Sequence, residues 1–161
     1  MRFPGSWRRS APGADASSPQ SRTSPFSRTM RFTPTDLDGA VIVELDGHAD
    51  ARGYFARSFC EEEFGRAGIA MRVVQTNISR NPRKGTLRGM HYQSDPFGEA
   101  KIVQCVRGAI FDVAVDLRPR SPTYRRWAAV ELSAEGNRLF IFRPAAPTVS
   151  LRSMRIATSS I

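Results

Sequence analysis

GTLRGMHYQSDPFGEAKIVQCVRGAIFDVAVDL, residues 85–117, is the stretch of the sequence that decides the fold. Residues 86–92, 100–107 and 109–117 each have the apolar and β-branched content of a strand. A cluster of turn residues at 94–98 separates the first two segments, and Gly108 separates the last two. Three strands in succession predict a fold made mainly of β-structure.

Polar and charged side chains recur along these apolar strands. In residues 109–117, alternation assigns Phe111, Val113, Val115 and Leu117 to one face and Asp112, Ala114 and Asp116 to the other. We predict that the polar groups gather on one wall of a barrel mouth, where convergent groups hold a polar ligand in an apolar cavity. This set comprises Arg88, His91, Gln93, Lys101, Asp112 and Asp116.

Short strands also flank this stretch. They are predicted at residues 41–45, 54–59, 73–78, 127–132 and 138–141. One short helix is predicted at 61–67, with acidic residues in its first turn and Gly68 placed to end it. Roughly eight short strands with one brief helix predict an all-β sandwich, jelly roll or small barrel.

The charge of the chain is concentrated at its ends. Of the formal net charge of +9, residues 1–29 supply +4 and residues 142–161 supply +3, so that residues 30–141 carry only +2. A uniformly basic protein would suggest a nucleic-acid partner. Because the excess lies in two segments with little folding signal, nucleic-acid binding becomes a minor alternative.

The first 29 residues are rich in Ser, Pro and Arg and have no apolar period, so disorder is predicted. They resemble an organelle transit peptide in composition, but four prolines oppose an amphipathic helix, and a natural start at Met30 is the preferred interpretation.

Cys60 and Cys105 have no metal-ligand spacing and indicate free thiols in a reducing compartment. No apolar run reaches the ~20 residues of a membrane span, and a cytoplasmic protein is expected.

Five runs of sequence together carry a family resemblance over residues 30–141: DARGYF (50–55), VQTNISRN (74–81), GTLRGMHYQ (85–93), EAKIVQCVRGAIFDVAVDLRPRSPTY (99–124) and WAAVELSAEGNR (127–138). In order and spacing they resemble dTDP-4-dehydrorhamnose 3,5-epimerases and related sugar-nucleotide epimerases. The resemblance implies a cupin-like jelly roll, no cofactor, a homodimer and a nucleotide-linked 4-keto-6-deoxy sugar as substrate. Its most specific part is LRGMHYQ, with lysine ten residues after the histidine.

The chemistry of such an epimerase suits these residue types. A proton beside a ketone becomes removable when a base is within reach and a cationic group receives the charge that develops on the oxygen. His91 is suited to the base, because histidine titrates near ~6.5, and Lys101 is suited to the enolate oxygen. The resemblance also implies substrate contacts by Arg52, Gln75, Asn77 and Arg88. Where the family commonly has glutamate, this chain has Arg57.

Other interpretations stay open at this point. Without the resemblance, His91 is a structural histidine and the arginines are members of surface ion pairs. A catalytically silent sugar-nucleotide binding module and an epimerase acting at one carbon are the alternatives to a double epimerase. Metal-binding jelly rolls use two or three histidines and a carboxylate, and only His91 lies in residues 85–117, so no metal site is predicted.

The sequence departs from the family after Ile141. The expected Ala-His-Gly-Phe motif and the strand with the tyrosine that acts as general acid are absent from residues 142–161. If Pro147 to Ser150 are encoded CCC ACG GTT TCN, the neighbouring frame reads His-Gly-Phe. We therefore expect a single-nucleotide frameshift near Phe142, a jelly roll that is incomplete at its C-terminus, and a tail that is out of frame.

Overall fold

The computed structural model describes residues 30–93, 97–142 and 152–157, the last of these by its backbone. In chain order the elements are β1 (Arg31–Pro34), β2 (Ala40–Glu44), β3 (His48–Asp50), β4 (Gly53–Phe55), α1 (Glu61–Arg66), β5 (Leu87–His91), β6 (Lys101–Gln104), β7 (Ala109–Val115), β8 (Trp127–Ser133), β9 (Arg138–Phe142) and β10 (Arg152–Ala157).

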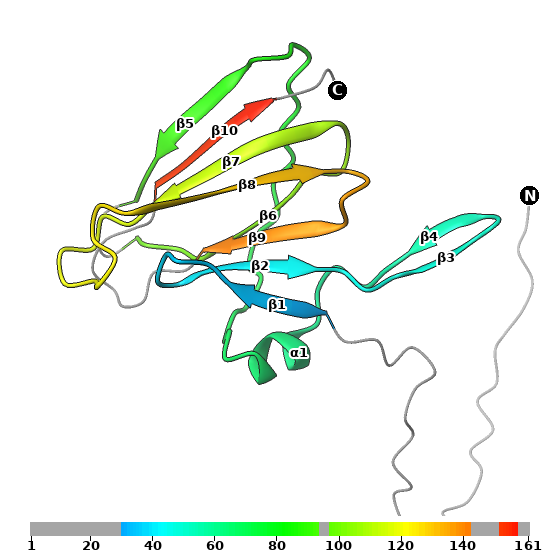
Figure 1. Cartoon of the computed structure of the whole chain (residues 1–161), viewed down its shortest axis with the longest axis horizontal. Coiled ribbons are helices and arrows are strands. Elements are labelled where there is room, and N and C mark those ends of the chain that lie inside the picture. Colours follow the sequence, from blue (N-terminus) through cyan, green and yellow to red (C-terminus); the bar gives the residue numbers. More distant parts are fainter. Residues whose placement is uncertain (1–29, 94–96, 143–151, 158–161) are drawn as a thin grey trace, which may run out of the picture.

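Two four-stranded antiparallel sheets form the body of the protein (Figure 1). One has the strand order β1-β2-β9-β6 and the other has the order β5-β10-β7-β8. The β3–β4 hairpin projects away from this sandwich (Figure 1). An open sandwich of two antiparallel sheets agrees with the sandwich, jelly roll or small barrel that the spacing of strands and turns predicted, and with the jelly roll that the family resemblance implied.

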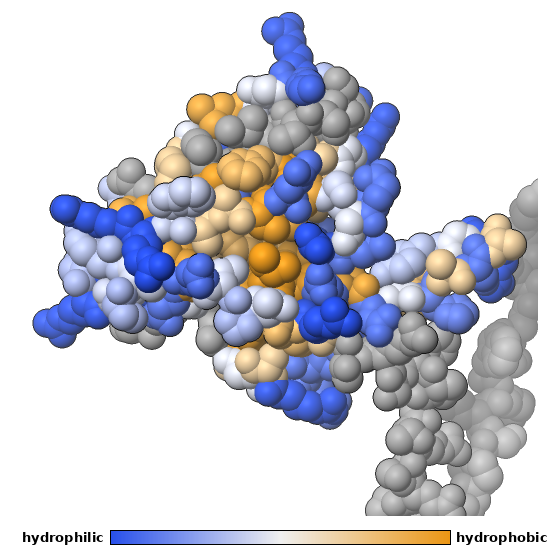
Figure 2. All heavy atoms as spheres, in the orientation of Figure 1, coloured by the Kyte–Doolittle hydropathy of each residue, from blue (hydrophilic) through white to orange (hydrophobic). Residues whose placement is uncertain are grey.

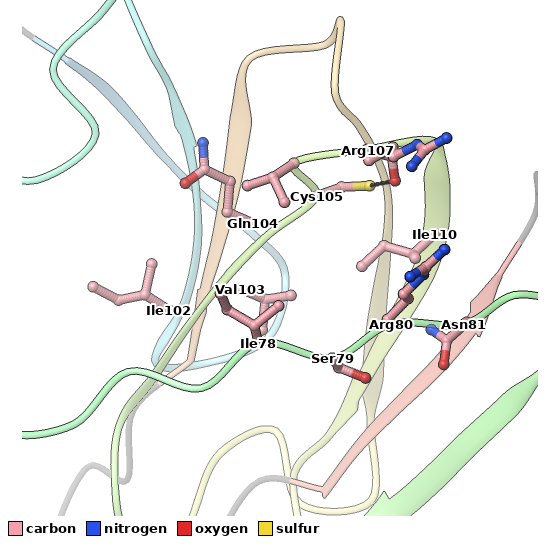
Figure 3. A pocket seen from close by; sticks show the side chains of 11 residues that line it. Ile78, Ser79, Arg80, Asn81, Ile102, Val103, Gln104, Cys105, Arg107 and Ile110 are labelled. Carbon is pink, nitrogen blue, oxygen red and sulfur yellow. Dashed lines mark hydrogen bonds between the residues drawn. The ribbon is translucent and has the colours of Figure 1, made fainter. Parts of the chain in front are cut away.

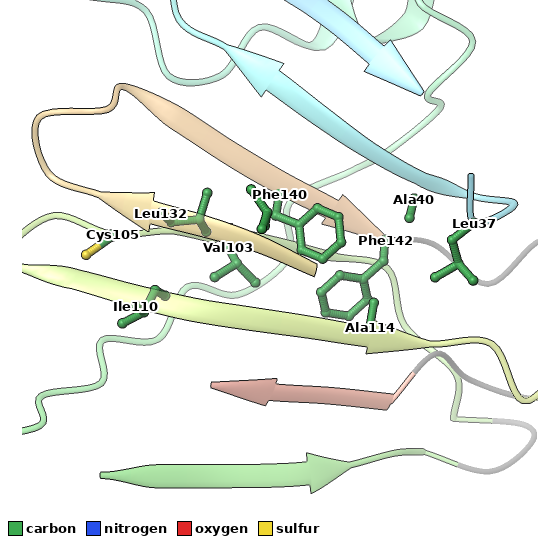
Figure 4. Close-up of a cluster of buried hydrophobic side chains, with 10 residues drawn as sticks. Leu37, Ala40, Val103, Cys105, Ile110, Ala114, Leu132, Phe140 and Phe142 are labelled. Carbon is green, nitrogen blue, oxygen red and sulfur yellow. The ribbon is translucent and has the colours of Figure 1, made fainter. Parts of the chain in front are cut away.

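Apolar side chains from both sheets form the core between them. Phe140 and Phe142 of β9 lie against Ala114 and Ile110 of β7 and against Val103 of β6 (Figure 4). The two phenylalanine rings pack on each other with their centroids 5.7 Å apart. Because β7 and β9 belong to different sheets, this contact joins the two halves of the fold.

The inner face of β7 carries the residues that alternation assigned to its polar face. Ile110, Asp112 and Ala114 are buried on the face that packs against the other sheet, whereas Phe111 is exposed. The face predicted to be polar is therefore the inner one, and Asp112 and Asp116 are both fully buried. Alternation predicted which residues share a face but not which face packs inward, since both faces of this strand carry apolar residues.

Helix α1 covers a second core cluster on the other side of the β1-β2-β9-β6 sheet. Phe64 is buried there with Val43 and Ile141, and the ring of Phe32 meets it edge-on at 5.3 Å. The helix ends as predicted, because Gly68 has a φ of +72°, a conformation that glycine adopts without steric cost. Three acidic residues occupy its first turn.

Three further predictions of secondary structure differ from the observed elements. Residues 73–78 are not a strand, because no described strand forms a ladder with them. The strand predicted at 54–59 ends at Phe55, and the loop before it contains β3. In the tail, residues 152–157 form β10 between β5 and β7. The disorder predicted for residues 1–29, the turn centred on 94–96 and the rest of the tail lie outside the described residues.

A buried polar cluster closes the end of β7. The carboxylate of Asp116 accepts hydrogen bonds from Arg118 Nε at 2.8 Å, from Arg118 Nη2 at 2.7 Å and from the Thr123 hydroxyl at 2.7 Å. Ser121 donates to the same carboxylate, and Arg118 also reaches the carbonyl oxygen of Asp38 at 2.6 Å. Burial opposes ionisation of Asp116, but these donors outweigh it and hold its pKa well below the usual range.

We predict that Asp116→Ala lowers the free energy of unfolding by about 3–5 kcal/mol, since the substitution leaves the buried guanidinium of Arg118 with only the exposed carboxylate of Asp38 as its ionic partner. Urea denaturation followed by circular dichroism measures this loss. Because the pKa of Asp116 is depressed in the folded state, its stabilisation is complete above about pH 4 and is lost as the pH falls further. The variant should therefore show a weaker loss of stability in acid.

Asp50→Ala is the matched control, because Asp50 also pairs with an arginine two residues later, Arg52, but at an exposed site. Solvent screens that pair, so the urea midpoint should stay where it is in the unchanged protein. Equal effects of the two substitutions would contradict a structural role for the buried cluster.

Candidate substrate site

Strand β5 carries two of the predicted site residues, Arg88 and His91. In a regular strand, residues three apart point to opposite faces. Here the pairing with β10 shifts register between Ser153 and Arg155, so that Arg88 and His91 fall in the rows of Asp112 and Ala114 of β7. Both of these β7 residues face the interior. Since opposed residues of neighbouring strands share a face, Arg88 and His91 both belong to the inner face of their sheet.

Lys101 begins β6, the terminal strand of the opposite sheet. It is paired in register with Phe142, whose ring lies beside Ala114 (Figure 4). His91 lies in the row of Ala114, so His91 and Lys101 belong to the same end of the sandwich but to different walls. The ammonium of Lys101 forms an ion pair with Glu99.

A pocket of about 380 Å³ opens along the edge of β6 (Figure 3). Its walls are the connecting segment 78–81, strand β6 with the three residues that follow it, and Ile110 of β7. The lining combines apolar groups such as Val103 and Cys105 with the guanidinium groups of Arg80 and Arg107. An apolar surface beside two cations suits a ligand with a ring at one end and an anionic group at the other.

None of the predicted site residues is among those that line this pocket. Arg88 reaches its wall, because Arg88 donates to Asn81, which lines the pocket. Gln75 and Asn77 belong to the connecting segment just before the pocket wall and are exposed. Arg52 is at the turn of the projecting β3–β4 hairpin, paired with Asp50. The single wall predicted for the polar groups is wrong, because Lys101 belongs to the other sheet and Asp116 to the buried cluster.

Three residues that line the pocket were not predicted from the sequence: Arg80, Asn81 and Arg107. Asn81 and Arg80 belong to a run that ends in NPRKG, which has the composition of a turn. Arg107 follows a strand and has no motif of its own. Asn81 is buried, and this burial is the signal that would have identified it as a site residue. Burial depends on the tertiary structure and could not be read from the sequence.

Arg57, at the position where the family commonly has glutamate, is engaged elsewhere in the fold. Its Nη1 donates to Glu63 Oε1 of α1 at 2.6 Å, and this bond raises the pKa of Arg57. Glu63 is buried and also accepts from the backbone N–H of Met30 at 3.0 Å. The bonds of Glu63 to Arg57 and to Met30 thus hold helix α1 against the segments that precede it.

Within residues 30–93 and 97–142, no group of three or more His, Cys, Asp and Glu side chains is arranged to hold a metal ion. In the part of the chain that the structure describes, no helix has the length and apolar content needed to cross a membrane. Cys60 and Cys105 are free thiols. Cys105 forms part of the pocket floor, and burial raises the pKa of its thiol.

We expect iodoacetamide to alkylate Cys60 at least about tenfold faster than Cys105 in the folded protein, since the thiolate is the reactive form and burial disfavours it at Cys105. Peptide mass spectrometry of timed samples gives both rates, and the same reaction in 8 M urea is the control, where the rates should become similar. Faster alkylation of Cys105 in the folded protein would show that the pocket floor is open to solvent.

The fold places the chain among cupin-like jelly-roll proteins. The profile of the family described as dTDP-4-dehydrorhamnose 3,5-epimerase matches residues 34–147. The chain belongs to this family.

Relatives of known name agree with this assignment. The dTDP-4-dehydrorhamnose 3,5-epimerase of Methanothermobacter thermautotrophicus is 48% identical over 111 residues, which are 69% of this chain and 59% of the relative. That of Shigella flexneri is 44% identical over 110 residues, 68% of this chain and 60% of the relative. The chain therefore spans about three fifths of the length of these curated relatives.

Solved structures are similar over most of the chain. The crystal structure of the Legionella pneumophila epimerase in complex with dTDP-4-keto-L-rhamnose has a TM-score of 0.73 and 37% identity, covering 81% of this chain and 66% of that one. A 4-keto-6-deoxy sugar epimerase from the novobiocin cluster of Streptomyces spheroides has a TM-score of 0.74 and 34% identity, covering 83% and 64%.

Proposed function

We propose that this protein epimerises dTDP-4-dehydro-6-deoxyglucose at C3 and C5 in dTDP-L-rhamnose biosynthesis, without a cofactor. The observation that carries the proposal is the placement of His91 and Arg88 on the inner face of β5, in a chain that belongs to an epimerase family. In this proposal His91 removes the proton next to the C4 ketone. Lys101 stabilises the negative charge that develops on the ketone oxygen.

The remaining predicted residues bind the substrate in this proposal. Arg88 pairs with the diphosphate, because a guanidinium fork matches two anionic oxygens. Gln75 and Asn77 supply amide groups to the sugar nucleotide from the segment that leads into the pocket. Arg52 needs movement of the hairpin or a second protomer to join them. Free thiols and a nucleotide-sugar substrate favour a cytoplasmic location.

Proton exchange tests the proposed chemistry. With dTDP-4-keto-6-deoxyglucose in heavy water, we expect deuterium to enter at C3 and C5, and NMR measures this incorporation. His91→Asn should slow exchange by about 10²–10⁴-fold, the usual contribution of a general base. His48→Asn is the matched control, since His48 is the other histidine of the chain and is exposed on β3, and it should exchange at the unchanged rate.

The same assay addresses the tail. We propose that a single-nucleotide frameshift near Phe142 puts the tail out of frame, so that it lacks the acid that protonates the opposite face of the sugar. A version with the tail restored to the neighbouring frame should then complete the epimerisation, whereas residues 1–161 exchange label without full turnover. Equal turnover by both proteins would contradict this proposal, and dTDP binding without any exchange in either would favour a silent binding module.

A single-centre epimerase is the second candidate function. The dTDP-4-dehydro-6-deoxyglucose 3-epimerase of Streptomyces bikiniensis is 44% identical to this chain, the same value as for the Shigella flexneri 3,5-epimerase. Deuterium at C3 alone in the restored protein would support this candidate.

We also propose a homodimer. β5 and β6 are the terminal strands of their sheets, and large apolar residues on and beside them are exposed, including Ile78 at 92%, Val106 at 74% and Leu87 at 57%. Apolar side chains also reach the surface over the middle of the molecule (Figure 2). A sheet edge with exposed apolar residues favours pairing with another chain.

Light scattering after size exclusion should give twice the mass of the 17.9 kDa chain. Ile78→Lys should shift the protein toward the monomer, because it puts a charge on the surface that the partner covers. Tyr124→Lys is the control, as Tyr124 is also exposed but lies in the loop between β7 and β8. A monomer at all micromolar concentrations would contradict the proposal.

A further inference from the structure

The guanidinium of Arg88 is held along one of its edges. Its Nε–H donates to Asn81 Oδ1 at 2.5 Å, and its Nη2 donates to the carbonyl oxygen of Arg80 at 3.3 Å. In arginine, the Nε–H and one N–H of Nη2 point in the same direction and form the side edge of the planar group. Asn81 and the Arg80 carbonyl therefore form an acceptor pair that matches this edge.

This arrangement leaves a defined set of donors. Of the five N–H groups of a guanidinium, two donate to residues that the structure describes, and the three others belong to Nη1 and to the outer side of Nη2. Two of these three point outward in parallel, as the end-on fork that pairs with two oxygens of a phosphate or carboxylate. The two protein acceptors thus orient Arg88 and leave this fork to a ligand.

Asn81 differs in burial from its surroundings. Its exposed fraction is 5%, whereas the residues before and after it, including Ile78 at 92%, are exposed. It lines the pocket together with Arg80 and Arg107 (Figure 3). A buried amide in an otherwise exposed segment has a defined position. The side chain that it holds is that of Arg88, a cation of the candidate site.

We propose that Asn81 is a positioning residue for a nucleoside diphosphate, acting through Arg88. It holds the side edge of the guanidinium so that the end-on fork binds the diphosphate of the ligand beside the pocket. Arg88 then loses little conformational entropy on binding, because most of its rotamer freedom has been given up in the fold. This inference rests on the proposed function and adds to it the residue that orients the anion-binding group.

Binding of dTDP to the full chain tests the proposal by isothermal titration calorimetry. We expect Asn81→Ala to weaken binding about tenfold, or ~1.4 kcal/mol, and Arg88→Ala to weaken it further. The double variant should bind no more weakly than Arg88→Ala alone, since Asn81 acts only through Arg88. If the two losses add, Asn81 does not act through Arg88, and the proposal is overturned.

Thermal melting by circular dichroism separates binding from stability. Thr123→Ala is the control, because it also removes a buried hydrogen bond, to Asp116, but in a different loop; it should lower the melting temperature and leave dTDP affinity unchanged. If Asn81→Ala does not fold, Asn81→Leu replaces it: the variant keeps the approximate shape of the side chain but removes the acceptor for Arg88 Nε, and we expect binding about tenfold weaker.

Undiminished dTDP binding by a folded variant that lacks this acceptor, Asn81→Ala or Asn81→Leu, would also overturn the proposal. Absence of dTDP binding by the unchanged chain would instead contradict the proposed function itself, so the two failures are distinguishable.

Discussion

The packing of β7 against β9 is the contact on which the rest of the structure depends. Ala114 and Ile110 of β7 meet Phe140 and Phe142 of β9, and this apolar layer is what holds the two sheets together. It also sets the geometry of the site. The row of Ala114 contains His91, and Phe142 is paired with Lys101, so the contact brings the proposed base and the proposed enolate-stabilising cation to the same end of the sandwich.

The same packing explains why two aspartates are buried. Once the even-numbered side chains of β7 face inward, Asp112 and Asp116 are carried into the interior with them. A buried carboxylate is costly unless donors surround it. Arg118, Ser121 and Thr123 provide those donors for Asp116, and in doing so they fold the loop after β7 back onto Asp38. The conformation of the loop after β7 thus follows from which face of β7 is buried.

The candidate site lies at the edges of the two sheets, beside the terminal strands β5 and β6. β5 and β6 are terminal strands, and the segment that connects α1 to β5 passes the edge of β6 without joining its ladder. This leaves a pocket with apolar walls and arginines at its rim. Arg88 links the pocket to strand β5, because it is on β5 with His91 and is bonded to Asn81 in the pocket wall. Its orientation depends on residues outside the predicted motif.

The sequence by itself determined the fold class, most strand positions, the helix and the family. These follow from local properties: the alternation of apolar residues, the turn chemistry of glycine, and a spaced motif that contains His91 and Lys101. Only the tertiary structure decided which face of β7 is buried, that residues 73–78 have no ladder partner, and that Asn81 orients Arg88. Those outcomes depend on which surfaces meet, and residues distant in the sequence decide that.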